Sequence, residues 1–148
     1  MANHLVVATA QSSAPRDVVW NVIAEVQYYS DWGIWSRAEL EREGAPDRQG
    51  VGAIRKLTKS PVVSREEVIE FEPGERLVYR LLSGLPVSDY IGAVSLSDDQ
   101  GGTRITWRSQ WTSRAPGMKR LITKAITEVS DLAAREAERR VRMHPPTG

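Results

Sequence analysis

The sequence predicts an α+β domain in which one antiparallel sheet packs against a long C-terminal helix. Between residues 116 and 141, apolar residues recur every three or four positions, which places them on one face of an α-helix. Between residues 36 and 112, runs rich in β-branched residues alternate with short turn sequences. Connections this short require antiparallel pairing. A sheet and an amphipathic helix each have an apolar face, so we expect the two faces to be buried against each other.

Size and composition fit one globular domain over residues 1–148. The chain is 41% hydrophobic and 26% charged, with a formal net charge of +1. A charge this close to zero gives no reason to expect a nucleic-acid partner. There is no cysteine, which excludes disulfides, thiolate catalysis and thiolate metal sites.

The sequence also bears on location. No apolar run approaches the ~18 residues of a membrane span, so we expect no integral membrane segment. The first residues lack a basic region followed by an apolar core, which is the pattern of a signal peptide. We therefore expect a cytoplasmic protein, with residues 143–148 as a frayed tail.

The N-terminal part predicts a strand followed by two helices. Residues 5–11 alternate and contain β-branched residues, as strands do. Ser12-Ser13-Ala14-Pro15 predicts a helix start with a serine cap, and the helix should end near Gln27. An aromatic turn over residues 28–33 predicts a short second helix that Gly33 ends.

Six further strands follow before the last helix. Their predicted ranges are 36–43, 51–58, 62–71, 76–82, 87–96 and 103–112. The strongest turn signal is residues 98–102, Asp-Asp-Gln-Gly-Gly, which predicts a hairpin. In the third of these strands Val68 and Ile69 fall on opposite faces, which a β-bulge would resolve.

Several short motifs, taken in order, resemble those of the SRPBCC, or START-like, superfamily. They are Ala14-Pro15, Val19-Trp20, Tyr29-Ser30-Asp31-Trp32, Gly50-Val51-Gly52, Glu70-Phe71-Glu72-Pro73, Arg76-Leu77-Val78-Tyr79 and Gly101-Gly102-Thr103-Arg104-Ile105-Thr106-Trp107. The resemblance runs from about Leu5 to Arg140 and is strongest for the polyketide cyclase/dehydrase-like branch.

This resemblance implies the helix-grip fold. In that fold a curved antiparallel sheet of about seven strands surrounds a long C-terminal helix, with a cavity between them. Members of the superfamily bind lipids, polyketides, sterols, hormones or other hydrophobic molecules, and some are cyclases or dehydratases. The superfamily has no universal catalytic residues, so the resemblance implies a small hydrophobic ligand but identifies no reaction.

Strand and helix periodicity place two sets of side chains opposite each other. From the sheet they are Tyr79, Tyr90, Trp107 and Trp111, and from the helix they are Met118, Ile122 and Ile126. As a cavity lining, the aromatic rings would hold a flat apolar ligand, and the phenols would orient it. The alternative is a filled core in which each buried phenol bonds the backbone or water, as buried hydroxyls commonly do.

Three charged residues add candidate chemistry. Arg55 could bind a carboxylate or stabilise an enolate if it faces inward, although Ile54 competes for that face and a solvated arginine is the favoured interpretation. Alternation aims either Glu66 or Glu67 inward, where a carboxylate could act as a base. An exposed pair on the outer face is the favoured interpretation for residues this polar.

The sequence lacks the patterns of a dinucleotide-binding loop, a metal site and a Ser-His catalytic triad. Gly50-Val51-Gly52 has neither the third glycine nor the strand-to-helix setting of a dinucleotide loop. The histidines and carboxylates show no metal-ligand spacing, and no histidine lies mid-chain to complete a Ser-His triad. We therefore expect no metal and no cofactor.

Three hypotheses about function remain. The leading one is a carrier or sensor of a small hydrophobic molecule (a lipid or a polyketide-like compound), held between sheet and helix. The second is a cyclase or dehydratase with polar groups converging in the same cavity, and the third is a partner-binding protein with a filled interior. The sequence does not distinguish a monomer from a homodimer.

Overall fold

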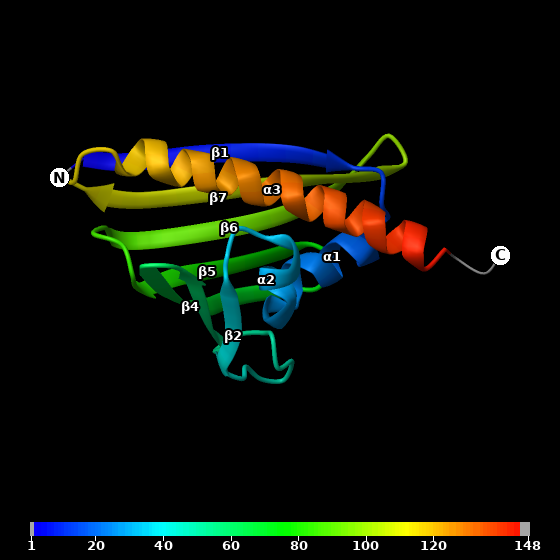
Figure 1. Ribbon diagram of the computed structural model, residues 1–148, viewed down its shortest axis with the longest axis horizontal. Coiled ribbons are helices and arrows are strands. Elements are labelled where there is room, and N and C mark those ends of the chain that lie inside the picture. Colours follow the sequence, from blue (N-terminus) through cyan, green and yellow to red (C-terminus); the bar gives the residue numbers. More distant parts are fainter. Residues whose placement is uncertain (1, 146–148) are drawn as a thin grey trace.

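The computed structural model describes residues 2–145 (Figure 1). Its strands are β1 (Ala2–Ser12), β2 (Arg37–Arg42), β3 (Ile54–Lys59), β4 (Val62–Glu72), β5 (Arg76–Ser83), β6 (Ser88–Asp99) and β7 (Gly102–Ser113). Its helices are α1 (Arg16–Ala24), the 3-10 helix η1 (Val26–Tyr28), α2 (Tyr29–Trp32) and α3 (Met118–Met143).

All seven strands form one antiparallel sheet in the order β1-β7-β6-β5-β4-β3-β2. β1 therefore pairs with the last strand, which brings the N-terminal strand next to the strand that precedes α3. The predicted β6–β7 hairpin is confirmed, since Asp99 pairs with Gly102 across Gln100 and Gly101. Both turn residues have positive φ, at 49° and 83°, as the favoured two-residue hairpin turns require.

The long helix α3 lies along β1 and β7 on the inner face of the curved sheet (Figure 1). Ile122, Ile126 and Val129 are buried, which confirms the predicted apolar stripe. The helix begins at Met118, directly after Gly117, whose left-handed backbone turns the chain into the helix. Leu121 belongs to the predicted stripe but is 48% exposed, because it lies at an opening between helix and sheet.

Along the chain, the short helices α1 and α2 come between β1 and β2. In space they lie beside the C-terminal half of α3 (Figure 1). The predicted serine cap of α1 is wrong. Pro15 occupies the cap position with no side-chain hydrogen bond. Instead, the buried Ser12 hydroxyl donates to the backbone carbonyl of Ala134, 2.9 Å away, and so joins the end of β1 to α3.

The structure shortens the predicted strand 51–58 at its start and confirms the bulge expected in strand 62–71. β3 begins at Ile54, since residues 51–53 form a turn that precedes it. The predicted bulge in β4 is confirmed, since Val68 pairs with Tyr79 and Glu70 with Val78, which leaves Ile69 as the extra residue. Val68 is thereby buried while Ile69 stays exposed.

At the C-terminus, α3 continues to Met143, beyond its predicted end at Val141. Met143 therefore belongs to the helix and not to the expected frayed tail, of which residues 146–148 lie outside the described part of the chain. Within residues 2–145, no helix combines the length and hydropathy needed to cross a lipid bilayer.

Candidate functional site

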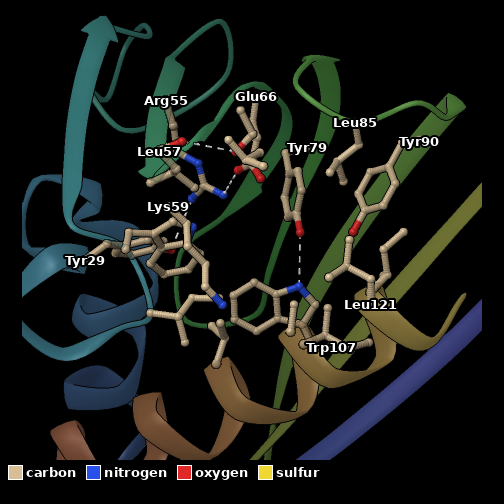
Figure 2. A pocket seen from close by; sticks show the side chains of 18 of the residues that line it. Tyr29, Arg55, Leu57, Lys59, Glu66, Tyr79, Leu85, Tyr90, Trp107 and Leu121 are labelled. Atoms are coloured by element: carbon tan, nitrogen blue, oxygen red, sulfur yellow. Dashed lines mark hydrogen bonds and ion pairs between the residues drawn. The ribbon is translucent and has the colours of Figure 1, made fainter. Parts of the chain in front are cut away.

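A cavity of about 360 Å³ lies between the sheet and α3 (Figure 2). The buried residues of its wall are Tyr29, Arg55, Leu57, Glu66, Tyr79, Tyr90, Trp107, Ile122, Ile126 and Val129. Its exposed lining residues are Lys59, Ser60, Pro61 and Val62 of the β3–β4 hairpin together with Leu121 of α3. The cavity therefore opens to solvent between this hairpin and the first turns of the helix. The third hypothesis from the sequence was a partner-binding protein with a filled interior. The presence of this cavity contradicts a filled interior.

Aromatic side chains from three neighbouring strands form one side of the wall. Tyr79, Tyr90 and Trp107 come from β5, β6 and β7 and point inward, as strand alternation predicts. Trp107 donates its indole N–H to the Tyr79 hydroxyl, with 3.1 Å between Nε1 and Oη (Figure 2). The Tyr90 hydroxyl shares a hydrogen bond with the Ser109 hydroxyl at 2.7 Å. Side chains therefore partner both phenols, and neither phenol has a backbone partner among the described residues.

Gly92 allows Tyr79 to lie flat against the sheet. It sits opposite Tyr79 in the β5–β6 ladder, and a Cβ atom added there would overlap the Tyr79 ring. Only glycine leaves room for this close approach of a ring to the neighbouring backbone. The ring therefore covers the floor of the cavity without projecting across it.

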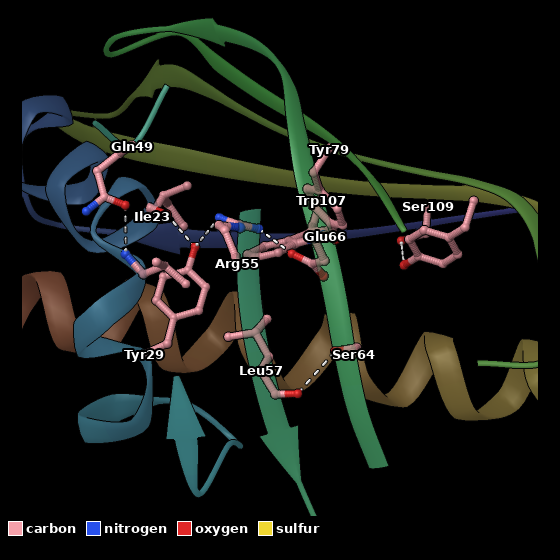
Figure 3. A network of polar contacts seen from close by, with 12 residues as sticks. Ile23, Tyr29, Gln49, Arg55, Leu57, Ser64, Glu66, Tyr79, Trp107 and Ser109 are labelled. Carbon is pink, nitrogen blue, oxygen red and sulfur yellow. Dashed lines mark hydrogen bonds and ion pairs between the residues drawn. The ribbon is translucent and has the colours of Figure 1, made fainter. Parts of the chain in front are cut away.

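Arg55 lies in the wall of the cavity, 1% exposed, so its predicted solvent exposure is wrong. The residue directly opposite it on β4 is Glu66. The Arg55 Nη2 atom donates to Glu66 Oε1 at 2.6 Å, and Nη1 donates to the Tyr29 hydroxyl at 3.2 Å (Figure 3). The guanidinium carbon also lies 5.4 Å from the ring centroid of Tyr29 and 5.0 Å from that of Tyr79. Charge, hydrogen bonds and aromatic faces together hold the guanidinium in the interior.

Glu66 was expected on the outer face with Glu67, and that expectation is also wrong. The two residues point in opposite directions, as alternation requires, and only Glu67 faces outward, where it bridges Arg42 and Arg80. Arg55 supplies the physical reason, because a buried carboxylate next to a guanidinium avoids most of the cost of burying an isolated charge.

Protonation of the cavity's polar groups follows from burial. Burial raises the pKa of the Tyr29 phenol, raises that of Tyr79 well above 10, and raises that of Tyr90 to about 12. All three phenols are therefore neutral at physiological pH and keep their hydrogens for donation. Burial alone lowers the pKa of Arg55, but Tyr29 and the Glu66 carboxylate offset it, so the net pKa is raised and the guanidinium stays charged.

Two residues predicted to line the cavity lie elsewhere. Trp111 is buried on the inner face, but it stacks on His4 and Tyr90 near the end of the sheet and is absent from the cavity wall. Met118 is only half-buried at the start of α3 and lies outside the wall. Both errors have one cause, since periodicity assigns a face but does not say where along that face the open space lies. The other predicted positions (Arg55, Tyr79, Tyr90, Trp107, Ile122 and Ile126) are part of the wall.

Sequence reasoning missed several wall residues, of which Tyr29 is the most important. Its hydroxyl donates to the backbone carbonyl of Ile23 and accepts from Arg55, so the aromatic turn anchors the charged end of the cavity. Its ring stacks on Trp35 with centroids 5.2 Å apart. The cluster of aromatic residues in this turn was a signal that Tyr29 is buried. Its contact with Arg55 could not be predicted, because the two residues are 26 positions apart in the sequence. Leu57, two residues beyond Arg55, was the corresponding signal that Arg55 faces inward.

The arrangement can orient an oxygen-bearing apolar molecule. One end of the cavity offers a guanidinium, a carboxylate and a phenol, and the remaining wall is mainly apolar and aromatic. Within residues 2–145, no three histidine or carboxylate side chains gather as metal ligands would.

Comparison with protein families gives one match across nearly the whole chain. The family described as polyketide cyclase / dehydrase and lipid transport matches residues 3–142. No curated protein shows significant sequence similarity to the chain.

Solved structures share the fold at low sequence identity. The Zhui aromatase/cyclase from Streptomyces sp. R1128 superposes with a TM-score of 0.83 at 20% identity, covering 99% of this chain and 100% of that one. The di-domain aromatase/cyclase StfQ of the steffimycin biosynthetic pathway gives 0.78 at 14% identity, covering 95% of this chain and 52% of that one. Ara h 8.0201 gives 0.75 at 10% identity, covering 93% and 99%. These three structures have the same curved sheet and long C-terminal helix.

Proposed function

The chain belongs to the polyketide cyclase / dehydrase and lipid transport family, and on that premise we propose that it binds a small hydrophobic molecule between the sheet and α3. The ligand is compact and largely apolar, carries a flat ring system, and has oxygen atoms at one end. It enters between the β3–β4 hairpin and Leu121, and its oxygens meet Arg55, Glu66 and Tyr79.

The observation that carries this proposal is the cavity itself. Its volume of about 360 Å³ lies in the range of small-molecule sites, and its wall is apolar and aromatic except for a few converging polar groups. Burial of a ring against Trp107, Leu57 and Ile126 supplies affinity through the hydrophobic effect. The polar groups fix the ligand's orientation, because a buried oxygen without a hydrogen bond costs free energy.

Native mass spectrometry of protein purified from its own host tests this proposal without assuming a ligand. We expect a retained small molecule that dissociates on unfolding. A fluorescence titration with polyketide-like aromatics, fatty acids and sterols then ranks ligand classes, because a ligand against Trp107 changes tryptophan emission and raises the melting temperature by mass action.

Trp107→Ala and Arg108→Ala are a matched pair for the titration. They are neighbours on β7, but Trp107 lies in the cavity wall and Arg108 is exposed on the outer face. Trp107→Ala should weaken the best ligand about tenfold or more, which corresponds to loss of one aromatic contact. Equal affinities in the two variants would mean that binding occurs elsewhere.

A second candidate function is ring closure or dehydration of a polyketide-like substrate. The specific observation that favours it is the convergence of Arg55, Glu66 and Tyr79 at one end of the cavity. The Glu66 carboxylate would remove a proton from a carbon between two carbonyls, while guanidinium and phenol N–H and O–H groups stabilise the enolate oxygen. The enolate carbon would then bond to a second carbonyl carbon, whose C=O π bond opens to an alkoxide that takes back the proton held by Glu66. Loss of this hydroxyl group as hydroxide, together with a second proton from the attacking carbon, would form a C=C bond and release water.

Incubation with a linear poly-β-ketone analogue tests this second function. The wild type should give a cyclised product that has lost water faster than the uncatalysed reaction does. Glu66→Gln should slow product formation by at least about a hundredfold, the usual contribution of a general base. Equal product rates with and without protein would contradict the enzymatic function. If the analogue nevertheless bound tightly, only the carrier function would remain supported.

A further inference from the structure

We propose that Glu66 makes the cavity selective for ligands whose buried end is uncharged, so that carboxylic acids are excluded as anions. This inference rests on the proposed ligand-binding function and narrows its ligand class. A buried arginine in an apolar cavity is normally a carboxylate receptor, because its planar fork of N–H donors matches a carboxylate. Here the structure contains that carboxylate already.

The charge of Arg55 is matched within the wall. Nη2 of Arg55 lies 2.6 Å from Oε1 of Glu66, and the two side chains are only 2% and 11% exposed. An anionic ligand at this end would place a second negative charge beside Glu66, with little water to screen the repulsion. Tyr29 and Tyr79 lie against the guanidinium and hold it beside Glu66, so Arg55 cannot turn to form a two-point pair with a ligand carboxylate, although a single N–H group can still donate to a ligand oxygen.

The hydrogen-bonding groups still unused at this end decide which neutral group fits. They include the Nε–H of Arg55, which is buried and has no hydrogen-bond partner among the described residues. The Tyr79 hydroxyl accepts a hydrogen bond from Trp107, which leaves its own hydrogen to donate to a ligand oxygen. Among the described residues only one of the two Glu66 oxygens has a hydrogen-bond partner, which leaves the other to accept from a ligand O–H. The matching group is therefore a phenol, an enol or a hydroxyketone, which offers both a donor and an acceptor without charge.

Lys59 is the other cation of the cavity and does not change this conclusion. The charged residues of the wall are Arg55, Lys59 and Glu66. Lys59 is exposed at the end of β3, at the opening, where water and salt weaken its attraction for an anion. A carboxylate held there would leave the polar end of the cavity empty.

Naphthol and naphthoic acid are suitable probes, since they share one two-ring body and differ in the charge of the polar group. Calorimetric titration at neutral pH should show wild-type protein binding naphthol at least about tenfold more tightly than naphthoate. Glu66→Gln should reverse this order, because it leaves the Arg55 charge free for the ligand carboxylate. Glu67→Gln on the outer face and Lys59→Ala at the opening should both keep the wild-type order.

A measurement on the wild type covers the case in which Glu66→Gln fails to fold. Naphthoic acid should enter the cavity only in its protonated form, so its affinity should fall about tenfold per pH unit above the acid's own pKa. Naphthol affinity should stay constant between about pH 5 and pH 8.

The outcomes separate this inference from the function on which it rests. Tight naphthoate binding by wild type at neutral pH, or an unchanged order in folded Glu66→Gln, would overturn the role of Glu66 while leaving ligand binding intact. Failure of both probes to bind the wild type would count against the proposed function itself, and this inference would fall with it.

Discussion

At the scale of residues, the central feature is one ion pair whose two partners are adjacent on neighbouring strands. Arg55 of β3 and Glu66 of β4 form a cross-strand pair that points into the cavity. A buried ion pair is weak support for stability, because the cost of removing two charges from water offsets their attraction. Its position in the wall of a cavity suits ligand recognition instead.

Glu66→Gln should lower the free energy of unfolding by roughly 3–5 kcal/mol, the usual effect of removing one partner of a buried pair. The cause is the uncompensated guanidinium of Arg55, which is buried and has no other carboxylate partner among the described residues. Urea denaturation at neutral pH measures this change.

Glu67→Gln is the matched control, because Glu67 is the next residue and bridges Arg42 and Arg80 at the exposed outer face. That change should cost about 0–1 kcal/mol. Similar losses in the two variants would mean that Glu66 is not the buried partner of Arg55.

Tyr90 predicts how stability depends on alkaline pH. Burial raises its folded-state pKa from about 10 to about 12, so the folded state favours the protonated phenol. The stabilisation is complete below about pH 10 and is lost as pH rises toward 12. Melting temperatures of the wild type should therefore fall across this window, and Tyr90→Phe should show a shallower fall. The burial argument fails if the two proteins lose stability in parallel.

At the scale of elements, periodicity predicted the faces of the strands and of α3, but not the partners across them. Trp107 and Ile126 could be assigned inward because apolar residues recur with them at the strand or helix period. Arg55 and Glu66 were not, because Ile54 and Leu57 imply opposite faces for Arg55 and polar residues usually lie outside. The β3–β4 register places the two residues directly opposite each other, so each is the buried partner of the other. Tyr29 was missed for a related reason, since it belongs to a turn, where no period applies.

Ile126→Ala should destabilise the fold by roughly 2–5 kcal/mol, because it removes a buried side chain where α3 packs on the sheet. Lys124→Ala, two residues earlier on the exposed side of the same helix, should cost much less. Chemical denaturation of both variants compares the two costs directly. Comparable values would show that α3 does not pack through this stripe.

At the scale of the whole molecule, residue patterns predicted the fold, whereas the cavity was implied only by the family resemblance and its extent was not predictable. The order of elements, the antiparallel pairing and the position of α3 all follow from patterns that extend over many residues. Whether the space between sheet and helix is filled depends instead on the sum of side-chain volumes there. Trp111 illustrates the difference, since it is buried on the predicted face yet packs against His4 and Tyr90 beyond the end of the cavity.

Blocking the cavity is the most direct test of the claim that it is the binding site. Ala125 lines it from α3, so Ala125→Phe would fill the space with a ring while leaving the polar end unchanged. Lys124→Phe adds a phenylalanine at the preceding, exposed position and is the matched control. Calorimetric titration of naphthol should show wild-type affinity in Lys124→Phe and at least about a hundredfold weaker binding in Ala125→Phe. Undiminished binding by a folded Ala125→Phe variant would contradict the account, because the ligand would then occupy some other part of the protein.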